Sequence, residues 1–187
     1  MPLRYNQIRE CDIANGEGIG IALFVQGCHF KCKNCFNPET WDFDGGKEWT
    51  KEVKEKFLEL ASKPYIKRIS LLGGECLTDE NLDDVLDLVC EIRKTFPNKT
   101  IWLYTGYQVK VFELQNSDHT EIEVFPKSQQ KPDLKRAEII SKCDVIVDGR
   151  FEEDKKDITL KWRGSRNQRV INVKESLERG EVILWTS

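Results

Sequence analysis

The fold of this chain is decided in the segment IGIALFVQGCHFKCKNC (residues 19–35), where an apolar run leads directly into three cysteines. Residues 19–25 have the length and composition of a buried strand, and a Gln-Gly pair ends it. Cys28, Cys32 and Cys35 then follow within eight residues. The sequence therefore predicts a strand that delivers a cluster of thiols to one of its ends.

Strands and helices alternate along the next part of the chain. Short apolar runs bounded by glycine or proline predict strands, and apolar residues at three- and four-residue spacing predict helices. This order favours parallel strands joined by right-handed crossovers, in an open sheet or in part of a barrel. The predicted strands are 19–25, 66–72, 100–105 and 144–148, and the predicted helices are 48–62, a segment from a cap at Thr78 or Asp79 to Pro97, a short one near 108–114, and 134–142.

The stretch from Asn116 to Asp133 differs from its surroundings in composition. It is polar and contains two prolines and a pair of glutamines. These residues break regular patterns, so we predict a long surface loop or linker inserted into the core.

Composition and charge exclude several classes of protein. The 187 residues contain 29 basic and 32 acidic side chains, for a net charge of −3, and no long basic tract suggests nucleic-acid binding. No apolar run is long enough for a membrane span, and no signal segment opens the chain, so we expect a cytoplasmic protein. Seven cysteines, an odd number, make a disulfide framework improbable in that compartment.

Three chemical signals follow the first three predicted strands. They are the cysteine cluster, the turn Gly73-Gly74-Glu75 and the turn Thr105-Gly106. Because the carboxyl ends of parallel strands meet at one edge of a sheet, we expect these signals to share a rim. A glycine pair allows a backbone to approach a ligand closely, and Glu75 could pair with a ligand's ammonium group.

The cysteine cluster is compatible with three kinds of chemistry. A structural zinc site needs four ligands, which His29 or Cys76 would have to complete. A thiol exchange site needs a Cys-x-x-Cys pair at a helix start. An iron–sulfur cluster usually takes four cysteines, so three would leave one iron open to an exogenous ligand.

Several motifs together resemble a known family. The spacing Cys28-x3-Cys32-x2-Cys35 followed by Phe36, with Gly73-Gly74-Glu75, is similar to the radical S-adenosylmethionine enzymes. Longer motifs resemble the activating proteins of anaerobic (class III) ribonucleoside-triphosphate reductases. They are Asn15-Gly16-x-Gly18, Leu23-Phe24-Val25-x-Gly27-Cys28, Asn37-x-x-Thr40-Trp41, Trp102-x-Tyr104-Thr105-Gly106-Tyr107, Val147-Asp148-Gly149-x-Phe151 and Trp162-Arg163-Gly164-Ser165-x-Asn167-Gln168-x-Val170.

The resemblance implies a fold and a reaction. The fold would be α/β, a small incomplete (β/α) barrel with parallel strands and outer helices. Residues 1–187 would form one radical S-adenosylmethionine domain, with a core at about 5–173, an insertion at about 116–133 and an extension at about 174–187. A [4Fe-4S] cluster would cleave S-adenosylmethionine reductively, and the 5′-deoxyadenosyl radical would take a glycine Cα hydrogen from the reductase. The implied partners are that reductase and a reduced flavodoxin or ferredoxin-type electron donor, with neither nucleic acid nor membrane.

The resemblance also implies site residues. The cluster ligands would be Cys28, Cys32 and Cys35. The residues implied to contact S-adenosylmethionine are Asn34, Cys35, Phe36, Gly73, Gly74, Glu75, Thr105 and Asp148. The chain departs from the family pattern at Gly20, where a basic residue is usual, and at Cys76, where proline is usual.

Other functions remain open from the residues alone. A radical S-adenosylmethionine enzyme could act on another glycyl-radical enzyme or on a small molecule. A zinc-stabilised binding module would instead be colourless and hold stoichiometric zinc. A ferredoxin-like electron carrier would normally use four cysteines and has no need of the Gly-Gly-Glu turn.

Overall fold

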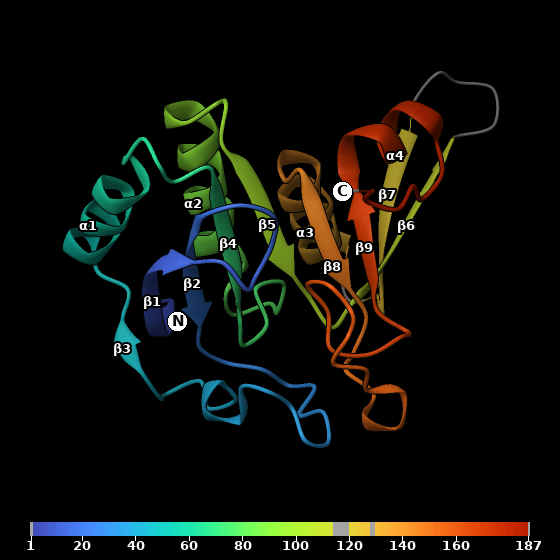
Figure 1. Cartoon of the computed structure of the whole chain (residues 1–187), viewed down its shortest axis with the longest axis horizontal. Coiled ribbons are helices and arrows are strands. Elements are labelled where there is room, and N and C mark those ends of the chain that lie inside the picture. Colours follow the sequence, from blue (N-terminus) through green and yellow to red (C-terminus); the bar gives the residue numbers. More distant parts are fainter. Residues whose placement is uncertain (1, 114–119, 128–129, 187) are drawn as a thin grey trace.

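The fold is built on a mixed seven-stranded sheet, seen in a computed structural model that describes residues 2–113, 120–127 and 130–186 (Figure 1). In sheet order the strands are β3 (Lys47–Glu48), β1 (Arg4–Asp12), β2 (Gly20–Val25), β4 (Arg68–Gly73), β5 (Thr100–Tyr104), β8 (Val145–Asp148) and β9 (Arg169–Asn172). The centre, β2-β4-β5-β8, is parallel, which confirms the predicted parallel core. Strands β1, β3 and β9, which the sequence patterns did not predict, add antiparallel pairs at the two sides.

One face of the sheet is covered by helices. These are α1 (Lys51–Ala61), α2 (Leu82–Thr95) and α3 (Gln130–Lys142), whose apolar stripes join alternate residues of the central strands in one large core. The strand residues in this core include Ile21, Leu23, Ile69, Leu71, Ile101, Leu103 and Ile146. Because a parallel strand is buried on both faces, all six residues of β2 are buried.

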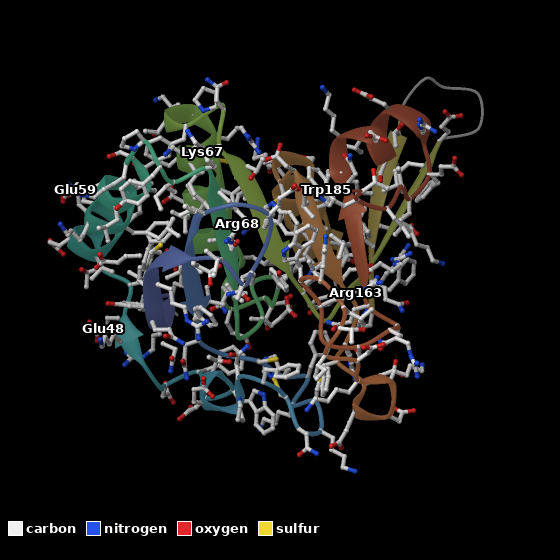
Figure 2. All side chains as sticks on the ribbon, in the orientation of Figure 1. Glu48, Glu59, Lys67, Arg68, Arg163 and Trp185 are labelled. Atoms are coloured by element: carbon white, nitrogen blue, oxygen red, sulfur yellow. The ribbon has the colours of Figure 1, made fainter. Side chains whose placement is uncertain are left out.

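The opposite face carries a second set of alternate residues. Trp102, Val145 and Val147 form a smaller cluster there, against which Trp162 and Trp185 pack. The loop between β1 and β2 covers the same face, since a side chain at Gly16 would meet both Arg68 and Trp102. Figure 2 shows Arg68 at the centre of the main sheet.

The predicted short helix near 108–114 is wrong. Residues Gln108–Glu113 form strand β6, which pairs antiparallel with β7 (Thr120–Phe125) in a separate two-stranded sheet. Val109 and Val111 alternate with polar residues, and this period of two is the pattern of a half-buried strand rather than of a helix. Leu114 lies outside the described residues.

The predicted surface loop at 116–133 is also wrong in part. It contains all of β7 and the first residues of α3. In β7, Ile122 and Val124 pack towards the core while Glu121 and Glu123, which alternate with them, lie on the other face. Tertiary packing thus makes a strand of a charged segment. Residues 116–119 and 128–129 lie outside the described residues.

The remaining differences concern element ends. Helix α2 begins after Asn81 rather than after a cap at Thr78 or Asp79, because the Thr78 hydroxyl donates to Glu80 and Asp79 pairs with Arg136. The tail forms α4 (Val173–Arg179), and two short 3-10 helices are η1 (Pro38–Thr40) and η2 (Glu153–Lys155). Within the described ranges, no helix has the length and apolar character that crossing a bilayer requires.

Candidate metal and cofactor site

A cavity of about 570 Å³ opens at the carboxyl ends of the parallel strands. In Figure 1 these ends lie at the lower edge of the main sheet, where the loops after β2, β4, β5 and β8 gather. Of the residues singled out from the sequence, the cavity is lined by Cys28, Cys32, Cys35, Phe36, Gly73, Gly74, Glu75 and Thr105. The structure therefore brings together side chains from three separate loops.

The cysteine loop is folded by its own backbone. Lys31 and Asn34 take left-handed conformations, with φ of 45° and 53°, and the Cys35 amide donates to the Cys32 carbonyl at 3.1 Å. The amide of Cys28 donates to the Trp41 carbonyl at 3.1 Å, which ties the loop to η1. These turns direct all three half-buried thiols to one cavity.

Burial disfavours the thiolate forms of Cys28 and Cys32 in the metal-free protein. Burial, with a smaller effect of the Glu75 carboxylate, raises the pKa of Cys28 to about 11. Burial and the Cys35 thiol raise the pKa of Cys32, against the Phe151 amide and the Arg150 guanidinium. Because metals bind thiolates, loading this site must release protons.

The donor set fits a cluster better than a single zinc ion. In the described part of the chain, no three His, Cys, Asp or Glu side chains converge on one ion-sized point. The two candidates for a fourth zinc ligand are turned elsewhere. His29 contacts Glu80 at 2.8 Å, and Cys76 is fully buried in the main core. Three soft thiols around a roomy cavity match an iron–sulfur cluster with one open iron.

The glycine pair after β4 lies against the start of the cysteine loop. The Gly74 amide donates to the Val25 carbonyl and the Glu75 amide to the Gly27 carbonyl, both at 2.8 Å. A Cβ at Gly74 would lie 2.6 Å from the Gly27 carbonyl oxygen, so no larger residue fits. The missing side chain thus lets the turn pack on the start of the cysteine loop, and Gly73 and Gly74 line the cavity beside the thiols.

The Glu75 side chain holds two turns together. Its carboxylate accepts hydrogen bonds from the Leu77 amide at 2.9 Å, the Thr105 hydroxyl at 2.8 Å and the Gly106 amide at 2.7 Å. Only 3% of the residue is exposed, and this burial outweighs the donors and raises its pKa to about 7. Glu75 and Thr105 therefore contact each other, and both line the cavity.

Two of the singled-out residues do not line the cavity within the described structure. Asp148 is buried, and its carboxylate accepts from the Val109 amide at 2.8 Å and from Arg169 Nε at 3.0 Å. The Asn34 side chain donates to Glu153. Phe36, by contrast, is 58% exposed at the mouth, with its ring 5.0 Å from that of Phe151.

Several lining residues carried no sequence prediction of a cofactor contact. Tyr104 has a buried hydroxyl with no hydrogen-bond partner in the described part of the chain, which leaves a polar group available to a ligand. Phe30 and Arg150 line the wall next to Cys32, and Arg163 lies among the loops below β9 (Figure 2). The alternation along β5 could have pointed to Tyr104, but no local signal marks Arg150.

Comparisons with known proteins cover most of the chain. Residues 14–171 match the family described as a 4Fe-4S single cluster domain. The chain is 35% identical over 168 residues to the anaerobic ribonucleoside-triphosphate reductase-activating protein of Enterobacteria phage T4, covering 90% of this chain and 93% of the relative. Proteins of the same name from Salmonella typhimurium and Escherichia coli K12 are 37% and 36% identical over 168 residues, covering 89% of this chain and 96% of each relative. The matched region contains all four strands whose ends form the cavity.

Proposed function

Because the chain belongs to the family of anaerobic ribonucleoside-triphosphate reductase-activating proteins, and to that of 4Fe-4S single cluster domains, we propose that it generates the glycyl radical of such a reductase. The observation that carries the proposal is the meeting of three thiols and the Gly73-Gly74-Glu75 turn on one cavity. When bound there, a [4Fe-4S] cluster supplies the electron that splits S-adenosylmethionine into methionine and a 5′-deoxyadenosyl radical, which takes a glycine Cα hydrogen from the reductase.

The residues of the cavity have distinct roles in this proposal. Cys28, Cys32 and Cys35 hold the cluster through their thiolates. Gly74 lines the cavity where the amino-acid moiety of S-adenosylmethionine would bind, and its missing side chain lets the turn pack against the Gly27 and Val25 carbonyls. Glu75 and Thr105 keep the turns after β4 and β5 in register, which positions that backbone.

Two further residues have a role in positioning rather than contact. Asp148 joins the end of β8 to β6 and β9 through the Val109 amide and Arg169. Asn34 joins the cysteine loop to η2 through Glu153, and its left-handed backbone turns the chain towards Cys35. Phe36 lies at the mouth, where it would contact the adenosine or the incoming protein segment.

The architecture supports a finer assignment. We propose that the open sheet is the small incomplete barrel of the radical S-adenosylmethionine type, with α1, α2 and α3 outside and the β1–β2 loop over the inner face. The whole chain, 1–187, would be one domain, with a core at about 5–173 and an extension at about 174–187. The start of this extension, α4, packs on the core through Val173 and Ser176.

Two partners follow from the reaction. The reductase must present its glycine at the mouth of the cavity, and a reduced flavodoxin or ferredoxin-type protein would supply the electron. We propose that the reaction takes place in the cytoplasm.

Anaerobic reconstitution with iron and sulfide tests the proposal. The protein should turn brown, and after reduction it should cleave S-adenosylmethionine to 5′-deoxyadenosine. Cys32→Ala should abolish both colour and cleavage, because it removes a ligand that two cysteines cannot replace. The matched control is Cys11→Ala, which removes an exposed thiol on β1 and should change neither result.

Adding the reductase distinguishes the proposed activity from that of an enzyme acting on a small molecule. A glycyl radical on the reductase, detected by electron paramagnetic resonance, is the expected result. Cleavage without this radical would favour another target, and retained cleavage in Cys32→Ala would refute the ligand assignment. A colourless protein with stoichiometric zinc would contradict the proposal as a whole.

A further inference from the structure

The segment Gly149–Phe151, directly after β8, is held by hydrogen bonds from the loop that precedes β9. The Gln168 side-chain amide donates to the Gly149 carbonyl at 2.9 Å, and the Asn167 amide donates to the Arg150 carbonyl at 2.8 Å. The Gly149 amide donates to the Tyr107 carbonyl at 2.9 Å. The backbone of this segment is therefore fixed, and its side chains project towards the cysteine loop.

The segment contacts the cysteine loop at two aromatic rings. The Arg150 guanidinium lies over the Phe30 ring, 4.2 Å from its centroid, and Phe30 stands between Cys28 and Cys32 in the sequence. Gly106 leaves room for the Phe30 ring. A Cβ at Gly106 would lie 2.4 Å from the nearest ring atom, so a larger residue would displace the ring. Phe151 packs against Phe36, the residue after Cys35, at 5.0 Å between centroids. Arg150 is thus seated on the loop that carries the thiols.

Most charged groups that line the cavity are already engaged. Arg163 donates to the Gln168 carbonyl at 2.9 Å, Asp157 accepts from Thr159, and Glu75 accepts three hydrogen bonds. Arg9 lies over Phe24, on the side of the cavity formed by β1 and β2. None of the three arginines forms an ion pair with a described acidic side chain, but among these arginines it is Arg150 whose guanidinium lies on a ring of the cysteine loop.

The segment places a positive charge next to the loop that contains Cys32. Arg150 lines the cavity together with Cys32, and its guanidinium lies over the ring of Phe30, two residues before Cys32 in the chain. Because opposite charges attract, a guanidinium at this place favours added negative charge on a cluster bound in the cavity. Net charge and hydrogen bonds to the sulfurs are established determinants of iron–sulfur potentials.

We propose that Arg150 is a positioning and tuning residue that raises the reduction potential of the cluster bound by Cys28, Cys32 and Cys35. This inference rests on the proposed function. Reduction moves one electron from a low-potential donor, which is oxidised by one electron, to the cluster, which gains one negative charge. A fixed guanidinium packed against the ligand loop stabilises the reduced form more than the oxidised form. A higher potential makes the cluster accessible to a soluble one-electron donor.

The loop lysines are poorer candidates for the same role. Lys33 lies between Cys32 and Cys35, but 85% of its side chain is exposed and its amine pairs with Glu153 at 3.3 Å. Solvent and this carboxylate both screen its charge from the cavity. Lys33→Gln is therefore a matched control, because it removes one positive charge from the cysteine loop itself.

A mediated redox titration with dithionite, followed by electron paramagnetic resonance of the reduced cluster, tests the proposal on reconstituted protein. In Arg150→Gln the ratio of reduced to oxidised cluster at a fixed potential should fall about tenfold, which is about 59 mV for one electron. Arg150→Lys should recover most of the difference because it keeps the charge. Lys33→Gln should match the wild type, and iron and sulfide content should be equal in all four proteins.

Several outcomes would overturn the inference. An unchanged potential in a fully loaded Arg150→Gln protein would do so, as would an equal shift in Lys33→Gln. Weaker binding of S-adenosylmethionine without a shift in potential would assign Arg150 to the ligand instead. If no cluster assembles in the wild-type protein, the proposed function itself fails, and this outcome is distinct from the others.

Discussion

Glu75 places a carboxylate between two turns of the cavity wall, where water is excluded. Because burial raises its pKa from 4.5 to about 7, the folded protein binds a proton there in a pH range where the unfolded chain does not. The stabilisation from this proton is complete below pH 4.5 and is lost as the pH rises to about 7. The metal-free protein should therefore lose stability across this window, by about 3 kcal/mol at most.

Urea unfolding at several pH values checks this prediction. Glu75→Gln should be less stable overall, because an amide cannot accept from all three donors, and its stability should depend less on pH than that of the wild type. Glu55→Gln, at an exposed position of α1, should keep the wild-type pH dependence. Identical pH profiles for the wild type and Glu75→Gln would contradict the raised pKa.

For single residues, the sequence predicted which residue types form the cavity better than it predicted where their side chains point. The cysteine triplet and the glycine pair are local signals, since their chemistry follows from residue type and spacing. Where Glu75 and Asp148 direct their carboxylates depends on donors far away in the chain, such as Gly106 and Arg169. No local pattern contains that information.

Among the elements, α1 shows how a distant side chain completes a helix end. The Lys99 amine donates to the carbonyls of Ala61 at 2.6 Å, Lys63 at 2.9 Å and Ile66 at 2.7 Å, all in or after the last turn of α1. These carbonyls have no intrahelical partner, and a cation is favourable at a helix C-terminus. Lys99 thus fixes α1 to the start of β5.

Replacing this lysine should destabilise the fold moderately. Lys99→Met keeps the aliphatic stem but removes the donor, and we expect a loss of about 1–3 kcal/mol in the free energy of unfolding. Chemical denaturation measures this loss, and Lys63→Met, at an exposed position in the same turn, is the control with little expected change. Equal stability of the two variants would mean that water donates hydrogen bonds to these carbonyls as effectively as the Lys99 amine does.

The β6–β7 hairpin shows the limit of prediction at the level of elements. Its strands are short and rich in charge, and their apolar residues become buried only when α3 and α4 pack on the hairpin. The central strands, in contrast, are mostly apolar runs and could be identified from composition alone. Segments whose burial depends on distant elements are those that the sequence patterns missed.

At the scale of the whole molecule, Arg68 connects the loop between β1 and β2 to the main sheet. Its guanidinium is fully buried, forms a salt bridge to Asp12 at 2.8 Å and donates to the Asn15 carbonyl at 2.7 Å. Gly20 is paired with Arg68 in the parallel register, and a Cβ at Gly20 would lie 2.7 Å from the guanidinium carbon. The neighbouring strand thus places a cation beside the position where the family usually has a basic residue.

Removing this cation should affect the whole fold. Arg68→Met leaves the Asp12 carboxylate buried without its partner, and we expect a loss of about 3–5 kcal/mol in the free energy of unfolding. Hydrogen exchange should also rise in the loop between β1 and β2, part of which lines the cavity. Lys67→Met, one residue earlier and exposed, is the control (Figure 2). Similar losses in both variants would argue against a specific role of the buried pair.

The sequence by itself determined the parallel core, the cysteine triplet and the three loops that share a rim, because each depends on residues close together in the chain. Three contacts were decided only by the tertiary structure. The Arg150 guanidinium packs on the Phe30 ring, Arg68 lies beside Gly20, and the Glu75 carboxylate accepts a hydrogen bond from the turn at Gly106. These contacts depend on register and packing between segments far apart in sequence. Hydrophobic periodicity specifies which face of a strand is buried, but not which distant side chain will meet it there.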